Sequence, residues 1–331
     1  MENELLYEMQ HAFALTQRPF EALAQKLNSD ETTVLKMVQA LKEKKIIRQT
    51  SAIFDTKRLG YTSSLVAFKV EESLVEEAAN IINQHPGVSH NYLRNHDYNI
   101  WFTMAVSPDS RLGLEKTIER LKALTHATDA ITLPTLKMFK ISVKMDTTGK
   151  RAKKEKVKKV IHTSLELTPQ YIAVIKELQK DIEIISEPFK ASIERLQMSY
   201  EEFFDIANRL KESGVMRRFA TILNHRKAGF GANAMSVWVV PEEKGEEIGR
   251  QMAEFSAVSH CYLRPSYPNW PYNLFAMIHG KSQEECDSLI EEMARESGLT
   301  QYSKLYSTVE FKKQRLVYFD DAFKAWEEQY A

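Results

Sequence analysis

The sequence is an imperfect tandem repeat. The string Leu41-Lys42-Glu43 recurs as Leu210-Lys211-Glu212, and many flanking positions match at the same spacing. After the insertion of one residue, the string from Val88 to Arg94 recurs from Val258 to Arg264 with a single difference. Self-similarity held in register over this length predicts that the chain contains two copies of one structural unit.

Composition excludes several classes of protein. A chain of 331 residues exceeds a single typical core, so more than one domain is expected. Its 45 basic residues balance its 45 acidic ones, and no overall positive field would attract nucleic acid or an anionic membrane. Cys261 and Cys286 lack the spacing of a disulfide framework or a zinc site. Without a basic and apolar leader or a long apolar stretch, a cytoplasmic protein with no membrane partner is expected.

Each copy begins with a predicted helical head. In the first copy, apolar residues recur at helical spacing over Leu5–Phe13, Phe20–Leu27 and Val34–Leu41. In the second copy, Thr168-Pro169 provides a helix N-cap followed by a first helical proline. Three short helices in this order predict a helix-turn-helix, winged-helix-like head.

The rest of each copy has the periodicity of a ferredoxin-like domain. The order strand, helix, strand, strand, helix, strand predicts a βαββαβ fold with an antiparallel sheet, so the fold class is α+β. In addition to the strand that carries the repeated string, the expected elements are Ser64–Val70, Leu74–Gln84, Asn99–Val106, Leu112–Leu124 and Ala130–Val143, then Met235–Val240, Gly245–Phe255, Asn273–Ile278, Glu284–Arg295 and Gln301–Phe311.

These elements predict six segments. The heads are residues 1–50 and 164–219, the ferredoxin-like domains 51–145 and 220–319, the basic linker 146–163 and the C-terminal tail 320–331. The linker holds a run of bases without apolar periodicity at first, which is typical of a solvated tether. Two such domains in one chain predict an intramolecular pseudo-dimer, and a further homodimer is left open.

The helix-turn-helix pattern suggests DNA binding, but its charge argues against it. The third helix would present its first turn to the groove, where arginine, lysine and amides are favoured. That turn is acidic in both copies, with Asp30-Glu31 and Glu201-Glu202. Acids there suit the helix dipole but repel phosphate. No nucleic-acid partner is expected, although a regulator that senses a ligand remains an alternative.

The repeated strand carries the main candidate site. Alternate side chains of a strand share a face, so His90, Tyr92 and Arg94 project together. Their counterparts in the second copy are His260, Tyr262 and Arg264. A titratable imidazole, an aromatic wall and a guanidinium suit a large anionic ligand. The alternative is an ordinary strand with polar side chains, which the repetition makes less favourable.

The turn after this strand differs between the copies. In the second copy it is longer by four residues and contains three prolines, which stiffen its path. Tyr267, Trp270 and Tyr272 would present flat apolar surface beside Arg264, suited to a planar macrocycle edged with acids. Packing of this loop against the neighbouring copy is the alternative. Further local positive charge comes from Arg48, Arg217, Arg218, His225 and Arg226.

Two strings carry a resemblance to a known family. GVSHNYLRNHDYNIWFT and AVSHCYLRPSYPNWPYNLF resemble the two subunits of siroheme decarboxylase, an Lrp/AsnC-like family of haem biosynthesis, joined end to end. The similarity covers nearly all of both copies, and the two unequal turns occur in the expected order. It implies removal of carbon dioxide from two acetate side chains of siroheme, giving didecarboxysiroheme. No cofactor beyond the iron of the siroheme substrate is implied.

The chemistry of the implied reaction suggests roles for the candidate residues. His90 and His260 would supply the proton that replaces the departing carbon dioxide. Arg94 and Arg264 would hold non-reacting carboxylates, because a cation on the departing one would stabilise the ground state. Arg48, Arg217, Arg218 and Arg226 are further carboxylate partners, and Tyr92, Tyr262, Tyr267, Trp270 and Tyr272 would line the ring. His96 or His225 is the candidate axial ligand of the substrate iron. A haem or siroheme carrier is a further alternative.

Overall fold

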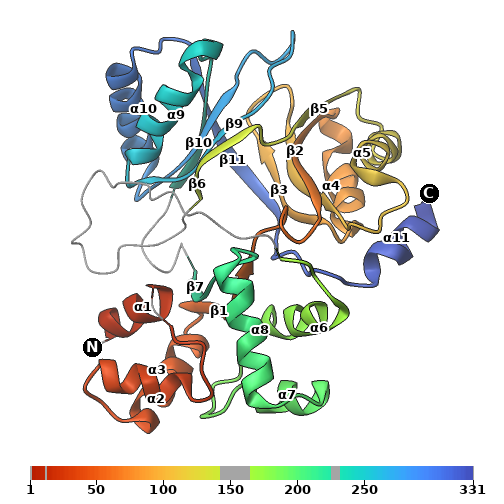
Figure 1. Ribbon diagram of the computed structural model, residues 1–331. Helices are drawn as coiled ribbons and strands as arrows, with labels where there is room; N and C mark the ends of the chain where they lie inside the picture. Colours follow the sequence, from red (N-terminus) through yellow and green to blue (C-terminus); the bar gives the residue numbers. More distant parts are fainter. Residues whose placement is uncertain (1, 12, 142–164, 225–231, 331) are drawn as a thin grey trace. The chain divides into compact units, whose positions relative to one another are not determined.

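The structure, a computed structural model, describes residues 2–11, 13–141, 165–224 and 232–330. It divides into two compact units (Figure 1). The first contains both heads, up to Leu59 and again from 165 to 224. The second contains the remaining described residues, from Gly60 to 141 and from 232 to 330. The linker predicted at 146–163 lies outside the described residues.

The first unit consists of six helices and a two-stranded sheet among its described residues. The antiparallel pairing of β1 with β7 joins the two copies directly. The predicted domain boundary at residue 50 falls inside β1, which belongs with the heads. The elements are α1 (Glu2–His11), α2 (Pro19–Lys26), α3 (Glu31–Glu43), β1 (Ile47–Phe54), α6 (Pro169–Leu178), α7 (Lys190–Leu196), α8 (Tyr200–Glu212) and β7 (Met216–Leu223).

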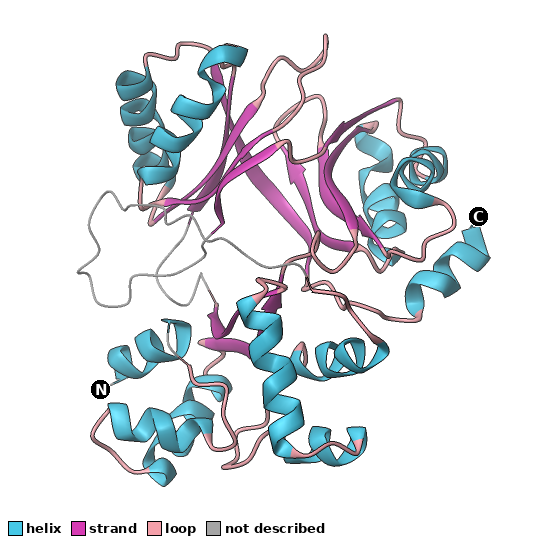
Figure 2. Ribbon diagram, viewed as in Figure 1, coloured by secondary structure: helices cyan, strands magenta, loops and turns pink. Residues whose placement is uncertain are grey.

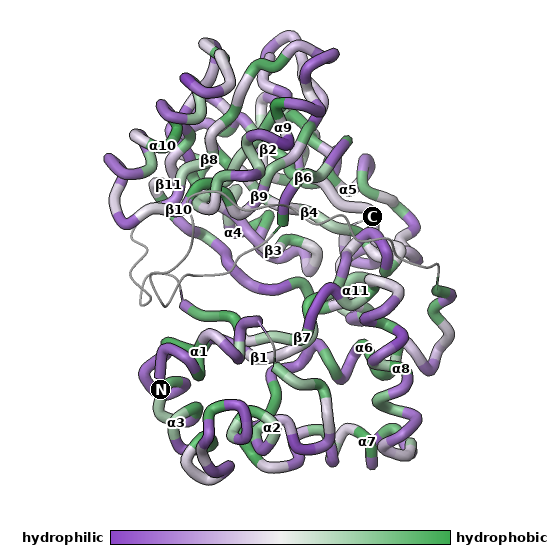
Figure 3. Tube along the Cα trace, turned by 60° about the vertical axis from the view of Figure 1, so that its left-hand side comes forward, coloured by the Kyte–Doolittle hydropathy of each residue, from purple (hydrophilic) through white to green (hydrophobic). Residues whose placement is uncertain are grey.

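The acidic turns of the heads act as helix caps. Asp30 accepts a hydrogen bond from the Thr33 backbone N–H at the start of α3. Ser199 and Glu202 form a reciprocal capping box at the start of α8. Hydrophobic and hydrophilic residues alternate along α8 (Figure 3), and its apolar side is buried in the unit. These carboxylates therefore satisfy backbone donors of the helices themselves.

The second unit contains two ferredoxin-like domains (Figure 2). The strand order β5-β2-β4-β3 in the first copy is that of an antiparallel βαββαβ sheet, which confirms the predicted fold class. The elements of the first copy are β2 (Thr62–Lys69), α4 (Val75–Gln84), β3 (Val88–Arg94), β4 (Ile100–Val106), α5 (Gly113–Leu124), β5 (Asp129–Leu133) and β6 (Lys137–Ile141). Those of the second are β8 (Ala232–Trp238), α9 (Gly245–Glu254), β9 (Val258–Leu263), β10 (Leu274–Gly280), α10 (Gln283–Ser297) and β11 (Tyr302–Lys313).

Exchanged strands join these domains into one nine-stranded sheet. In the first copy, the predicted strand Ala130–Val143 is divided into β5 and β6 on either side of Pro134, which has no N–H for a sheet bond. β6 pairs with β9 of the second copy. Its counterpart β11 is continuous, pairing first with β8 and then with β3 of the first copy. Each copy therefore extends the sheet of the other.

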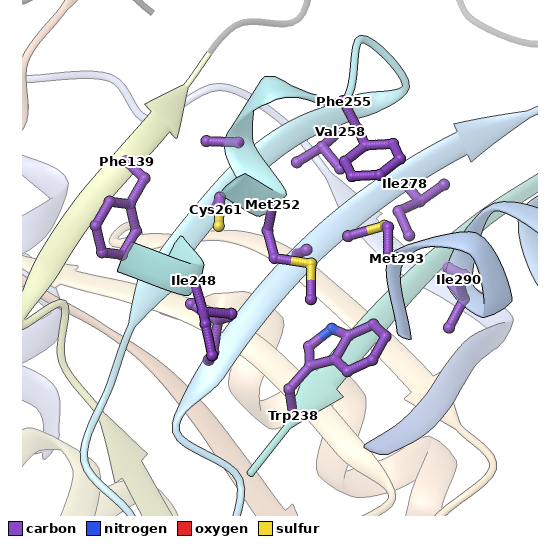
Figure 4. Close-up of a cluster of buried hydrophobic side chains, with 14 of the residues drawn as sticks. Phe139, Trp238, Ile248, Met252, Phe255, Val258, Cys261, Ile278, Ile290 and Met293 are labelled. Carbon is purple, nitrogen blue, oxygen red and sulfur yellow. The ribbon is translucent and has the colours of Figure 1, made fainter. Parts of the chain in front are cut away.

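Three apolar cores lie within this unit. One lies beneath α4 and α5, a second beneath α9 and α10, and a third joins β2, β4 and β5 to β8 and β10. Figure 4 shows the second core, in which Phe139 from exchanged β6 lies close to α9. A methyl group on Gly249 of α9 would lie 2.1 Å from the Phe139 ring. The exchanged strand therefore packs against a helix with no side chain at that position.

The C-terminal residues form a helix rather than the expected tail. Helix α11 (Ala322–Tyr330) packs on the core of the first ferredoxin-like domain through Trp326. Its buried Glu327 accepts hydrogen bonds from Ser110 and from the Arg111 backbone N–H. The sequence carried a signal for this helix that the predicted domain division left out, because Phe323, Trp326 and Tyr330 recur at helical spacing. None of the described helices is long and apolar enough to cross a membrane.

Candidate active site

The histidine, tyrosine and arginine of each repeated string lie on one face of the nine-stranded sheet. This face turns towards the core between the two ferredoxin-like domains and is called the inner face. Tyr92 of β3 is directly opposite Trp101 of β4, which belongs to the core between the two domains. Tyr262 is likewise opposite Phe275, a member of the same core. Residues opposite one another in an antiparallel pair share a face. His90, Tyr92 and Arg94 therefore face the second domain, and the second trio faces the first.

A β-bulge precedes each histidine. Val88 and His90 of β3 pair with consecutive residues of β4, so Ser89 between them has no partner there. Ser259 of β9 is likewise skipped in the pairing with β10. A bulge turns the extra side chain towards its neighbour's face. The Ser89 hydroxyl lies 3.0 Å from His90 Nδ1. The Ser259 hydroxyl lies 2.8 Å from His260 Nδ1.

Beyond the serines, the two copies differ. The Ser89 hydroxyl reaches the Thr103 hydroxyl at 2.7 Å. The Ser259 hydroxyl instead reaches Nε2 of His279 on β10 at 2.8 Å. Burial lowers the pKa of His279 to about 4, and the charge of Lys313 acts in the same direction. His279 is therefore neutral at physiological pH.

The two arginines are buried and form reciprocal bonds between the copies. Arg94 donates from Nη1 to the Leu305 carbonyl at 2.8 Å, and Arg264 donates to the Leu133 carbonyl. Desolvation lowers the pKa of each guanidinium to about 10. Neither Nε has a hydrogen-bond partner among the described residues, and neither arginine joins an ion pair there. Each also lies over the ring of the tyrosine two residues before it.

The proline-rich turn of the second copy packs against the first copy. Tyr267 and Trp270 form a tight turn through reciprocal backbone hydrogen bonds. Trp270 is fully buried, with its ring centroid 5.1 Å from that of His96 and 5.1 Å from that of Trp101. The Tyr267 hydroxyl bonds to the Thr132 carbonyl of β5. This arrangement favours the alternative of packing against the neighbouring copy for Trp270, whereas Tyr267 retains an exposed surface.

His96 has a hydrogen bond that bears on its suggested role as an iron ligand. Its Nδ1 accepts from the Tyr98 backbone N–H at 3.0 Å, so the neutral ring carries its proton on Nε2. A protonated nitrogen has no lone pair for a metal. Ligation of iron by His96 would therefore require this bond to break.

Three of the remaining predicted residues belong to the first unit. Arg48 lies on β1, and Arg217 and Arg218 lie on β7, all in the first unit. Arg217 is paired with Asp55 at 2.7 Å. His225 and Arg226 lie outside the described residues. Tyr272 contacts Trp270, with the ring centroids 5.0 Å apart.

Sequence reasoning missed Ser89, Ser259, Thr103 and His279. The serines had a visible signal, because Val-Ser-His is repeated in both copies. The bulge that directs them towards the histidines depends on the pairing of β3 with β4 and β9 with β10. Thr103 and His279 stand on different strands from the histidines, and their positions differ between the copies. Only the sheet register brings them together.

Other parts of the described structure suit an anionic aromatic ligand less well. An open hollow on the exposed side of α9 is lined mainly by glutamates, which would repel an anionic ligand. No group of three or more histidine, cysteine or acidic side chains in the described part of the chain could hold a metal ion. The inner face thus remains the better candidate for an anionic aromatic ligand.

Comparison with known proteins decides the family. The model of an AsnC-like ligand binding domain matches residues 58–140 and 227–312, and that of the siroheme decarboxylase NirDL-like HTH domain matches 2–48 and 172–217. A siroheme decarboxylase of Hydrogenobacter thermophilus is 43% identical over 324 residues, which cover 98% of this chain and 96% of the relative. The chain belongs to the siroheme decarboxylase family. This confirms the resemblance seen in the sequence.

Relatives within the siroheme decarboxylase family also explain the repeat. The alpha and beta subunits of the Desulfovibrio desulfuricans enzyme match 43% and 47% of this chain, at 43% and 36% identity. The chain therefore corresponds to two such subunits fused. A crystal structure of the siroheme decarboxylase NirDL in complex with an iron-uroporphyrin III analogue is similar over 99% of this chain and 98% of its own, with a TM-score of 0.79 and 37% identity.

Proposed function

We propose that this protein is a siroheme decarboxylase, a carboxy-lyase that removes carbon dioxide from two acetate side chains of siroheme and yields didecarboxysiroheme. Membership of the family over nearly the whole chain supports this activity. The complex of a similar protein with an iron-uroporphyrin III analogue supports a tetrapyrrole ligand. The observation that carries the proposal is the inner face itself. In each copy a half-buried histidine and a buried arginine without a carboxylate partner among the described residues lie on either side of a tyrosine.

The chemistry required is simple to balance. The bond between the acetate methylene and its carboxylate breaks, carbon dioxide leaves, and the electron pair stays on the methylene carbon, where the ring delocalises it. That carbon takes one proton and becomes a methyl group. A histidine that titrates near neutral pH is suited to donate this proton and to recover it from water. His90 and His260 are assigned this role.

The arginines suit a different task. A cation bound to the departing carboxylate would stabilise the substrate but not the transition state, because the charge of that carboxylate disappears as carbon dioxide forms. Such a contact would slow the reaction. Arg94 and Arg264 are therefore assigned to bind the carboxylates that do not react. Tyr92 and Tyr262, half-buried on the same face, would line the macrocycle. The iron enters with the substrate, so no additional cofactor is proposed.

The two ferredoxin-like domains are proposed to act as an in-chain pair. The exchanged β6 and β11 already provide each domain with a partner strand from the other copy. The purified protein is then expected to be a monomer or a dimer of such chains. Light scattering that gave a large ring would contradict this arrangement. The two cysteines are buried free thiols, which suits the reducing cytoplasm.

Anaerobic incubation with siroheme, followed by mass spectrometry of the tetrapyrrole, tests the activity. The expected product lacks one carbon dioxide for each of two acetates, without DNA present. A carrier would return siroheme with an unchanged mass, and a ligand-sensing regulator would also bind a specific duplex in a salt-sensitive way. Either result without decarboxylation would refute the proposal.

Single substitutions locate the chemistry. We expect His90→Ala or His260→Ala to reduce the turnover number by about 100-fold or more where that histidine donates the proton. His11→Ala, on an exposed face of α1, is the matched control and should leave turnover unchanged. Undiminished turnover in both inner-face variants would reject the catalytic assignment. Loss in one variant alone would identify the copy that holds the proton donor.

A further inference from the structure

We propose that His279 is a positioning residue that orients His260 through Ser259 and makes the two repeats chemically unequal. The proposal rests on the proposed function in one respect, the assignment of His260 as a proton donor. The three side chains form a chain of hydrogen bonds. His260 Nδ1 lies 2.8 Å from the Ser259 hydroxyl, and that hydroxyl lies 2.8 Å from His279 Nε2.

The direction of the hydrogen bonds follows from the protonated state of His260. An imidazolium must donate from both nitrogens, so Nδ1–H donates to the Ser259 oxygen. The serine then has one hydroxyl proton to donate. Nε2 of a neutral His279, at 2.8 Å, is its nearer acceptor, and the Met277 carbonyl lies at 3.4 Å. Only a neutral His279 can complete the chain. The Nε2 of His260 is the nitrogen assigned to donate a proton to a ligand on the inner face.

The surroundings of His279 keep it neutral. It lies on β10, where burial opposes its positive form, and Lys313 of β11 is the charged side chain that also opposes it. Lys313 is directly opposite His90 across β11 and β3. Tyr262 also faces His260, with the ring centroids 6.1 Å apart. Lys313 is itself paired with Glu310 at 3.6 Å.

The first repeat lacks this arrangement. His90 is opposite Thr103 of β4, and His260 is opposite Met277 of β10. Two residues further along each strand, β10 has His279, whereas β4 has Ala105. The Ser89 chain ends on the Thr103 hydroxyl, which also accepts from the His90 backbone N–H at 3.2 Å. A hydroxyl is a weaker acceptor than an imidazole nitrogen. The positive form of the histidine is therefore better supported in the second repeat, whose His260 becomes the preferred acid at neutral pH.

Titration of the histidine side chains by NMR tests the chain without substrate. The protein is labelled with 15N-histidine, and the His260 signals are assigned from their absence in His260→Ala. We expect His279→Ala to move the His260 titration midpoint about 0.5 to 1 pH unit lower, the shift that corresponds to loss of one hydrogen bond. His279→Gln, which keeps an acceptor near the former Nε2, should restore most of the midpoint.

Two serine variants provide matched comparisons. Ser259→Ala should lower the His260 midpoint as His279→Ala does, and the double variant should add little, because both changes break one chain. Ser89→Ala should leave the His260 midpoint unchanged, because Ser89 contacts His90. An unchanged His260 midpoint in His279→Ala, with a folded protein by circular dichroism, would overturn the proposal. So would full additivity of the Ser259 and His279 effects.

Turnover measurements connect the chain to the reaction. With siroheme, His279→Ala should reduce kcat more than it changes KM, and the limb of the pH profile set by the acid should move to lower pH by the same amount as the NMR midpoint. A wild-type protein that does not decarboxylate siroheme would refute the proposed function while leaving the NMR result intact. A His260 midpoint that shifts without any change in the kcat profile would overturn the role of His279 in catalysis.

Discussion

Replacement of Arg94 by methionine should separate folding from ligand binding. Arg94 is 5% exposed and has no carboxylate partner among the described residues. Its pKa falls from 12.5 to about 10, which corresponds to a penalty of about 3 kcal/mol on the charged form. The penalty is present at every pH below about 10, because the group is charged there in both the folded and unfolded states. Arg94→Met removes this penalty.

The same substitution removes one favourable interaction. The Leu305 carbonyl, which accepts from Arg94 at 2.8 Å, loses its donor, at a cost of about 1–3 kcal/mol. The two effects largely cancel, so we expect the free energy of unfolding to rise by no more than about 2 kcal/mol. Affinity for an iron-uroporphyrin III ligand should fall about 10-fold or more, because a charge-assisted contact contributes about 1.5–3 kcal/mol.

Urea unfolding at pH 7 and titration with the tetrapyrrole measure these two quantities. Arg217→Met is the matched comparison, because Arg217 is paired with Asp55 at 2.7 Å. Its removal leaves a partly buried carboxylate uncompensated and should destabilise the fold by more than Arg94→Met does. A loss of more than about 3 kcal/mol in Arg94→Met would show that the buried guanidinium stabilises the fold. Unchanged ligand affinity would refute its role in the site.

Three further outcomes are expected from the second unit. Gly249→Ala should lower the free energy of unfolding by about 1–3 kcal/mol, because the added methyl group meets the Phe139 ring, and Phe139→Leu should partly restore it in urea melts. The pKa of buried His85 is lowered to about 3, so its contribution to stability is complete above about pH 6.5 and is progressively lost as the pH falls towards 3. His85→Phe introduces the residue found at this place in the second copy. It should flatten the pH dependence of the urea unfolding midpoint between about pH 7 and 4.5. Trp326→Ala should lower the free energy of unfolding by about 3–5 kcal/mol and expose α11 to proteolysis. Gel analysis of limited proteolysis would detect the cleavage. Protease resistance equal to that of the wild type would contradict the docking of α11.

The sequence by itself determined the architecture and the face that carries the site. The repeat fixed the number of copies, periodicity fixed the order of helices and strands, and alternation placed His90, Tyr92 and Arg94 on one side of β3. Family membership also followed from local strings, because the unequal turns are distinctive without any knowledge of their partners. These are properties of residues close together in the chain.

Pairing between distant strands decided the rest. The exchange of β6 and β11, the burial of Trp270 beneath the first copy and the reciprocal bonds of Arg94 and Arg264 all join residues more than one hundred positions apart. The chain from His260 to His279 likewise needs a bulge at Ser259 and the register of β9 on β10. A strand displaced by one residue would turn every side chain to the other face. Local sequence cannot specify that choice, because the free energy that selects the register comes from packing in the completed sheet.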